Sequence, residues 1–186
     1  LPDVDIDVGD RNKLLSLFEK WTPARLEDGK SHNTGVYFTD IPYDALNDTA
    51  TLDYKQAEEL GYFKLDILNV SVYQQVESYQ HLDELLSKEP PWQRLWTDPD
   101  YTEKLIHIGS YYKLLQQMRP DTLARMAMFL AVIRPSKRHL VGKDWKTVAE
   151  TIWDKPDDGS YYFKKAHAVS YAHLVQVHMN LLDSLD

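Results

Sequence analysis

Near the start of the chain, acidic and apolar side chains alternate over residues 3–8. The apolar positions are Val4, Ile6 and Val8, and the acidic positions are Asp3, Asp5 and Asp7. Successive side chains of a β-strand point to opposite faces. The pattern therefore predicts a strand over residues 1–8 with one aliphatic face and one acidic face.

A second alternating segment spans residues 62–68. Phe63, Leu65 and Ile67 occupy one face, and Lys64 and Asp66 share the other. If this strand lies beside the first, both strands bury an aliphatic face and carry acids on the opposite face.

Apolar residues at helical spacing predict helices over residues 11–21, 72–86, 123–133 and 161–182. Asp10 and Asp121 are the expected N-caps of the first and third helices. A short strand is expected at residues 35–39, a loop at 40–51 and an irregular connection at 90–101. The 186 residues suffice for one domain with a sizeable core, so a single domain over residues 1–186 is predicted.

Composition narrows the possible functions. The chain has no cysteine, which removes disulfides, thiolate zinc sites and cysteine nucleophiles and fits a reducing cytoplasm. No apolar run approaches the roughly 20 residues of a membrane span, so no membrane association is expected. The net charge of −8 argues against strong DNA affinity by this chain alone. The chain starts at Leu1 rather than methionine, as expected of a trimmed chain or part of a longer product.

The aspartates on the two strands form a candidate metal site. Asp5 and Asp7 lie two residues apart on one strand, and Asp66 on an adjacent strand can complete the set. Such carboxylates can hold two Mg²⁺ or Mn²⁺ ions about 4 Å apart. Lys64 shares the strand face of Asp66 and is expected beside the ions. The alternative is a solvated acidic strand edge without a ligand.

Other catalytic motifs fail on spacing. Gly29, Lys30 and Ser31 look like the end of a P-loop, but residue 24 is alanine where that motif requires glycine. The seven histidines show no zinc-ligand spacing, and no nucleophile-elbow sequence is present.

Several sequence blocks, in order, resemble the α-subunit family of bacterial DNA polymerase III. Leu1-Pro-Asp-Val-Asp-Ile-Asp7 is similar to the family's P-D-x-D-x-D signature, and Gly61-Tyr-Phe-Lys64-Leu-Asp66 to its G-x-x-K-x-D block. Further similar blocks are Ser31-His32-Asn-Thr-Gly35-Val36, Met118-Arg119-Pro120-Asp121, Ala131-Val132-Ile133-Arg134-Pro135 and Tyr162-Phe163-Lys164-Lys165-Ala166-His167. The resemblance covers only the palm domain of that family.

The resemblance implies an α/β (α+β) fold with a mixed β-sheet backed by helices, as in the polymerase β-like nucleotidyltransferase palm. It implies that Asp5, Asp7 and Asp66 are catalytic metal ligands. It also implies that substrate contacts come from Lys64, Arg134, Lys165, His167 and His32.

The departures from the family are deletions and replacements. The family's long insertion between Asp7 and His32 is missing, and residues 135–161 are a shortened segment. Ser136 stands in place of the glycine of its R-P-G block, and Tyr111 in place of an arginine expected near the nucleotide. Fingers, thumb, exonuclease-like domain and clamp-binding tail are absent from this sequence. Such reduction is typical of a phage or mobile-element gene.

The leading hypothesis is metal-dependent nucleotidyl transfer on DNA or a nucleoside triphosphate in the cytoplasm. A partner protein is expected to supply the functions of the missing fingers and thumb. One alternative is a non-catalytic protein that uses a polymerase-like surface to bind a replication component. Others are a DNA-modifying transferase derived from the palm and an unrelated acidic α/β domain.

Overall fold

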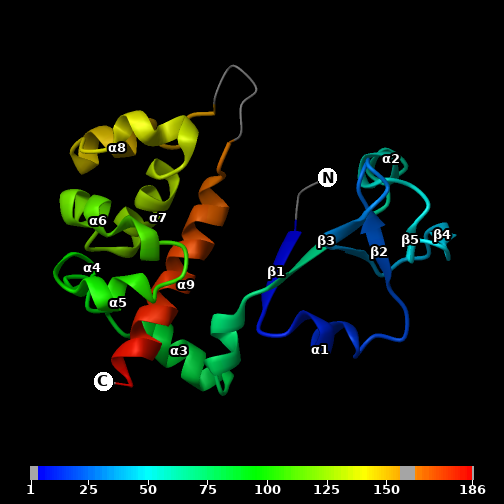
Figure 1. The fold of residues 1–186 in the computed structure, drawn as a ribbon, viewed down its shortest axis with the longest axis horizontal. Helices are drawn as coiled ribbons and strands as arrows, with labels where there is room; N and C mark the ends of the chain where they lie inside the picture. Colours follow the sequence, from blue (N-terminus) through cyan, green and yellow to red (C-terminus); the bar gives the residue numbers. More distant parts are fainter. Residues whose placement is uncertain (1–3, 156–161, 186) are drawn as a thin grey trace. The chain divides into compact units, whose positions relative to one another are not determined.

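Figure 1 shows the computed structural model of the protein, which describes residues 4–155 and 162–185. The chain forms two compact units, an N-terminal unit (Leu1–Gln75) and a C-terminal unit (Val76–Asp186). Each unit has its own hydrophobic core, and the prediction of one functional domain over residues 1–186 stays a prediction. Asp3 and residue 161, the predicted start of the last helix, lie outside the described residues.

The N-terminal unit is built on a mixed sheet of four strands in the order β1-β6-β3-β2. Strand β1 is parallel to β6, and the other neighbouring pairs are antiparallel. The mixed sheet backed by helices that the sequence predicted is therefore confirmed. The strands are β1 (Val4–Val8), β2 (Thr22–Arg25), β3 (Ser31–Tyr37) and β6 (Leu65–Asn69), with a separate hairpin of β4 (Tyr43–Asp44) and β5 (Thr49–Ala50).

Helices cover both faces of this sheet. Leu15 of α1 packs against Val36 and Ile67, whereas Ala57 of α2 belongs to a cluster with Tyr37. Val36 and Tyr37 are consecutive on β3, so the two clusters lie on opposite faces. The helices of this unit are α1 (Arg11–Leu15), α2 (Tyr54–Glu59) and the 3-10 helix η1 (Ser71–Gln75).

The predicted helix over residues 11–21 is wrong in its second half. Asp10 is the N-cap, as predicted, and accepts a hydrogen bond from the Lys13 N–H at 3.0 Å. The helix nevertheless ends at Leu15, and Thr22–Arg25 forms β2. Pro23 fits this strand because β2 is at the edge of the sheet, where a missing N–H donor is tolerated.

The regular elements of the C-terminal unit are all helices among its described residues. Its two main helices, α7 (Leu123–Val132) and α9 (Lys165–Asp183), pack along one another around a large apolar core. Helix α7 agrees with the predicted helix at residues 123–133, and α9 agrees with the one predicted at 161–182 except that residues 162–164 are not helical. None of the helices described in either unit is long and apolar enough to cross a membrane. The other helices are α3 (Tyr79–Ser87), α4 (Arg94–Thr97), α5 (Pro99–Glu103), α6 (Tyr112–Met118) and α8 (Trp145–Thr151), with 3-10 helices η2 (Gly109–Tyr111) and η3 (Pro135–Leu140).

Two capping details differ from the sequence prediction. Thr122, rather than Asp121, caps α7 by accepting a hydrogen bond from the Arg125 N–H at 3.2 Å. Asp121 instead pairs with the Arg125 guanidinium at 2.6 Å. The predicted helix over residues 72–86 is interrupted, because Ser78 caps a new helix, α3, by accepting from the His81 N–H.

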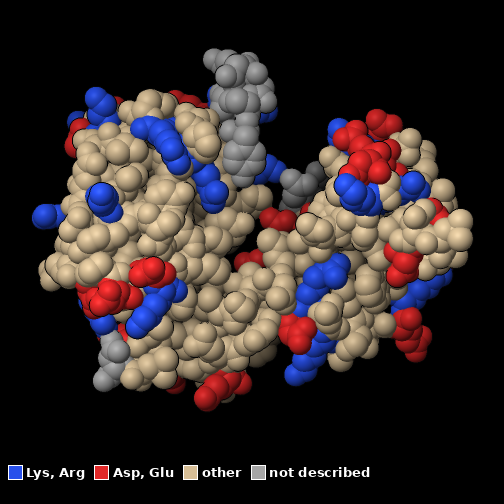
Figure 2. Space-filling view, viewed as in Figure 1, with Lys and Arg blue, Asp and Glu red and all other residues tan. Residues whose placement is uncertain are grey.

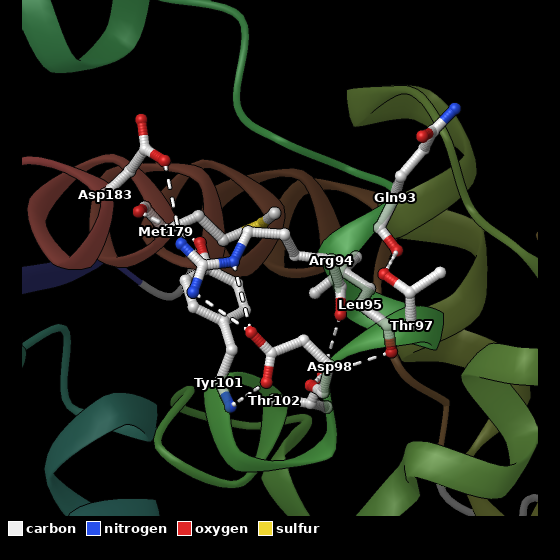
Figure 3. Close-up of polar contacts among 9 residues, drawn as sticks. All are labelled: Gln93, Arg94, Leu95, Thr97, Asp98, Tyr101, Thr102, Met179 and Asp183. Carbon is white, nitrogen blue, oxygen red and sulfur yellow. Dashed lines mark hydrogen bonds and ion pairs between the residues drawn. The ribbon is translucent and has the colours of Figure 1, made fainter. Parts of the chain in front are cut away.

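A polar network centred on Arg94 joins α4 and α5 to α9 (Figure 3). The Arg94 guanidinium lies 4.0 Å from the Tyr101 ring centroid and pairs with Asp98 at 3.0 Å and Asp183 at 3.8 Å. The Tyr101 hydroxyl donates to the Met179 carbonyl at 3.0 Å. The segment predicted as irregular, residues 90–101, is thus partly helical and anchored to the longest helix.

His178 gives the C-terminal unit a pH-dependent stability. Its Nδ1 accepts a hydrogen bond from the Ile106 N–H at 3.1 Å, which requires that nitrogen to be unprotonated. Burial lowers the pKa of His178 from its ordinary value of 6.5. The unfolded chain therefore binds a proton first as the pH falls. The resulting stability is fully present above the unfolded pKa and is lost as the pH falls toward the lowered folded pKa.

As the pH falls from about 7.5 to about 5.5, the free energy of unfolding is expected to decrease less in the His178→Asn variant than in wild type. The reason is that asparagine keeps a hydrogen-bond acceptor but does not titrate. The measurement is the urea midpoint at each pH. His139→Asn, which removes an exposed histidine, is the matched control and should keep the wild-type slope. If the urea midpoint changes equally with pH in wild type and in His178→Asn, then His178 does not contribute to the pH dependence of stability.

Candidate functional site

The parallel pairing of β1 and β6 brings two of the predicted metal ligands side by side. Asp5 and Asp66 are aligned Cα partners, and side chains of aligned residues in neighbouring strands point to the same face. Asp7 lies two residues further along β1 and shares that face. Asp5 is exposed, Asp7 is partly buried, and the Asp66 side chain is 13% exposed. The sheet thus gathers the three aspartates on one face.

The aliphatic face of these strands is buried less evenly than the sequence predicted. Ile67 of the interior strand β6 is 1% exposed, whereas Ile6 of β1 remains 36% exposed. The difference follows from topology, because β1 is an edge strand with a neighbour on one side only.

The Asp66 carboxylate is held by two donors. The Thr34 hydroxyl donates to Oδ1 at 2.8 Å, and the Lys64 ammonium group donates to Oδ2 in a short contact. His32 Nδ1 lies 3.8 Å from Oδ1. The Lys64 side chain therefore lies beside Asp66, as predicted, although the strand predicted over residues 62–68 begins only at Leu65 and Lys64 directly precedes it.

A bulge in β3 positions His32 and Thr34. Pro23 and Arg25 of β2 are two residues apart, but they pair with Val36 and Ser31, which are five apart. The extra residues leave the regular ladder, and bulges of this kind redirect side chains beside functional sites.

The His32 ring is a hydrogen-bond acceptor inside this bulge. Its Nδ1 accepts from the backbone N–H groups of Gly35 at 2.9 Å and Thr34 at 3.2 Å, so the ring proton is on Nε2. Burial lowers the pKa of His32, as do the charges of Lys64 and Arg11, while Asp66 opposes them. Thr34 and Arg11 were missed by sequence reasoning. The signal for Thr34 was its place in the His32–Val36 block.

Asp7 lies near the 3-10 helix that follows β6. Burial raises the pKa of Tyr73 in η1, and the negative charge of Asp7 raises it further. The acidic face therefore extends along β1 toward η1 within the N-terminal unit.

The remaining predicted substrate residues belong to the C-terminal unit. The Arg134 guanidinium lies 4.4 Å from the Phe163 ring centroid, and the His167 ring lies 6.5 Å from the same ring. Lys165 lies instead over Trp153, with Nζ 5.9 Å from that ring. Arg134 Nε is buried without a hydrogen-bond partner in the part of the chain that is described. Arg134 and His167 thus share one aromatic neighbour, and Lys165 does not.

The chemistry of the aspartate set suits a hard divalent cation. Carboxylate oxygens are preferred ligands of Mg²⁺ and Mn²⁺. A carboxylate offers about four lone-pair sites, so Asp66 can coordinate a cation while it still accepts the hydrogen bond from Thr34. Among residues 4–155 and 162–185, no three His, Asp or Glu side chains are already grouped as a metal would require. The carboxylate oxygens are suitable ligands for such an ion. The three side chains would have to move closer together when the ion binds.

Charge on the surface is mixed in the view of Figure 2. Described Lys and Arg side chains and described Asp and Glu side chains both occur on the visible face of each unit, separated by uncharged surface. Nucleic-acid binding by counterion release depends on clustered basic residues. The visible face therefore offers no extended basic surface among the described residues.

Comparisons with protein-family models, with curated proteins and with solved structures yield no match.

Proposed function

We propose that this protein catalyses metal-dependent nucleotidyl transfer on a DNA or nucleotide substrate, with Asp5, Asp7 and Asp66 as ligands of two Mg²⁺ or Mn²⁺ ions. The observation that carries the proposal is the in-register parallel pairing of Asp5 with Asp66, with Asp7 on the same face. Carboxylates from two adjacent strands are the donor arrangement that two-metal phosphoryl chemistry uses.

The residues have distinct proposed roles. When bound, the ions activate a hydroxyl nucleophile and offset charge on the leaving phosphates. Asp5, Asp7 and Asp66 would hold the ions through their carboxylate oxygens. Thr34 orients the Asp66 carboxylate through its hydroxyl hydrogen bond. Because the bulge fixes the His32 proton on Nε2, this residue can donate one hydrogen bond to a substrate oxygen.

The resemblance to the polymerase family supports further substrate contacts. Lys64, Arg134 and Lys165 carry positive charges that would bind phosphate, and His167 would contact the primer end or triphosphate. The Arg134 guanidinium stacks on Phe163, and its Nε is buried without a hydrogen-bond partner among the described residues, so Nε is a candidate donor to an anion.

The proposal includes a partner protein and a cytoplasmic setting. Synthesis on a duplex needs elements that hold the template and close over the base pair, and a chain with a net charge of −8 holds DNA weakly by itself. A partner that supplies these elements would permit template-directed synthesis. Without it, distributive addition or another transfer onto DNA is expected, in the compartment that holds nucleotides and DNA.

The test is calorimetric titration of wild type and the Asp5→Asn/Asp7→Asn double variant with Mn²⁺ and Mg²⁺, followed by addition of a primer-template and nucleotides. Wild type is expected to bind two ions, and the variant to lose affinity by more than about 100-fold, because direct ligands contribute more than outer-shell partners. Nucleotide incorporation should be lost in the same variant. Asp28→Asn/Asp40→Asn, which removes two exposed acids from the same unit, is the matched control.

The possible outcomes separate the hypotheses. Specific metal binding, together with nucleotide incorporation that requires Asp5 and Asp7, supports the transferase. Specific binding without incorporation favours another transfer reaction or a missing subunit. Absence of specific metal binding, with DNA and nucleotide present, would exclude the proposed reaction.

A second candidate function is non-catalytic binding of a replication component. The observation that favours it is an open depression of about 540 Å³ in the C-terminal unit, where Trp92 and Trp96 are among the lining residues. Tryptophans are enriched in the anchors of protein interfaces. If binding is the function, expression in a host should reduce DNA synthesis equally with wild type and Asp5→Asn/Asp7→Asn. Gln93→Arg, at an exposed lining residue, should relieve the effect.

A further inference from the structure

The Lys64–Asp66 pair is shielded from solvent more than an ordinary surface ion pair. The side chains are 19% and 13% exposed, respectively, and the ammonium group donates directly to Asp66 Oδ2. Lys30 and Asp28 have the same two-residue spacing, but their side chains are 79% and 52% exposed. A partly buried carboxylate needs a compensating charge, whereas an exposed one is neutralised by water and salt.

The path of Lys64 across the sheet depends on a glycine. A Cβ atom at Gly35 would lie 2.8 Å from Lys64 Cδ and 3.1 Å from His32 Nδ1. Gly35 is also the antiparallel Cα partner of Asp66 on β3. The methylene stem of Lys64 therefore runs through space that only a residue without a side chain leaves open. The absence of a side chain at Gly35 therefore favours this course of the Lys64 stem toward Asp66.

The surroundings of Asp66 explain why a cation is held there. Asp5 is its aligned neighbour on β1, so a second carboxylate lies on the same face. Thr34 satisfies Oδ1 but contributes no charge. Lys64 supplies a full positive charge to the other oxygen, Oδ2. In the absence of metal, this ammonium group offsets the charge that two neighbouring acids accumulate.

We propose that Lys64 is the resident counter-ion of Asp66 in the metal-free protein and that a divalent cation displaces its ammonium group when it binds. The inference rests on the proposed function, because it takes Asp66 to be a metal ligand. An ammonium group and a divalent ion cannot share one carboxylate oxygen without strong repulsion. Lys64 is thus a positioning residue that stabilises the empty site, lowers its affinity for metal, and is freed for substrate phosphate on metal binding.

The first experiment measures Mn²⁺ affinity by calorimetry and the thermal midpoint in EDTA for wild type, Lys64→Met and Lys30→Met. Lys64→Met is expected to bind Mn²⁺ at least about tenfold more tightly, because a repelling charge is removed. Its metal-free midpoint should fall by about 3 °C, because Asp66 loses its counter-ion. Lys30→Met removes an equally spaced but exposed partner and should match wild type in both measurements.

The second experiment needs no variant at the site. Wild-type protein is treated with an amine-acylating reagent with and without saturating Mn²⁺, and the modification of individual lysines is followed by mass spectrometry. The reactivity of Lys64 is expected to rise several-fold with Mn²⁺, because its ammonium group leaves the shielded pair. The reactivity of Lys30 should stay unchanged.

The failures of the two proposals are distinguishable. If wild type binds Mn²⁺ but Lys64→Met binds equally or more weakly, and bound Mn²⁺ leaves Lys64 protected, the counter-ion role is overturned while the metal site stands. If Lys64→Met binds Mn²⁺ and wild type does not, the counter-ion role is supported in its strongest form. If neither protein binds Mn²⁺, the proposed function and this inference fall together. If Lys64→Met does not fold, the acylation experiment on wild type decides alone.

Discussion

Truncation of Leu130 to alanine is expected to destabilise the C-terminal unit by about 3–5 kcal/mol, because it opens a cavity in a close-packed core. Leu130 lies on α7 and is 0% exposed. It belongs to the cluster formed where α7 packs along α9, which leaves little freedom for neighbours to fill the space. Urea unfolding followed by circular dichroism measures the change in the free energy of unfolding.

Leu46→Ala is the matched control for this prediction. Leu46 is 96% exposed, so the same chemical change should alter stability by no more than about 0.5 kcal/mol. Similar losses in the two variants would contradict the packing described for α7 and α9.

Substitution of Gly109 by alanine is expected to cost about 3 kcal/mol, at the upper end of overpacking effects, because the new methyl group meets rigid backbone. A Cβ atom there would lie 2.5 Å from the Glu103 carbonyl oxygen and 3.4 Å from that of Thr102. The Gly109 N–H donates to the Leu105 carbonyl at 3.0 Å, so a shift that relieves the clash also disturbs this turn. The thermal midpoint and the urea midpoint should both fall.

Gly61→Ala separates steric overlap from backbone conformation. A Cβ at Gly61 meets no atom within 4 Å, but its φ of +86° lies in the left-handed region. Alanine is disfavoured there by about 1 kcal/mol, so the loss should be clearly smaller than at Gly109. A larger loss at Gly61 would show that the close approach of Gly109 to Glu103 is not what limits substitution.

Much of the secondary structure was predictable because its signals are local. The apolar run of α7 and the alternating pattern of β6 needed only neighbouring residues. Helix α7 lies where the sequence placed it, whereas β6 (Leu65–Asn69) begins three residues after the predicted start at residue 62. The end of α1 was not predictable in this way. Leu17 and Phe18 continue its helical spacing but are 75% and 47% exposed, so they add little packing to extend the helix.

Strand β2 was missed for a related reason. Pro23 normally counts against a strand, and it is acceptable here only because β2 is at the edge of the sheet. Edge position is a property of the assembled sheet. No local pattern in residues 22–25 reports it.

For the candidate site, the sequence alone determined which residues share a strand face. The alternation places Asp5 with Asp7 on one face of β1, because side-chain direction along a strand has a period of two, and it predicted Lys64 beside Asp66. Only the tertiary structure decided that Asp5 aligns with Asp66, since register depends on how two distant strands pair.

The tertiary structure also decided the immediate partners of Asp66. The bulge in β3 brings Thr34 to its carboxylate, and the open space at Gly35 admits the stem of Lys64. These contacts depend on the spacing between strands that lie roughly 30 residues apart in the chain, for which hydrophobic periodicity carries no information. The sequence of each strand thus determines which acidic residues the candidate site contains. The packing of the sheet determines which charged and polar groups contact Asp66.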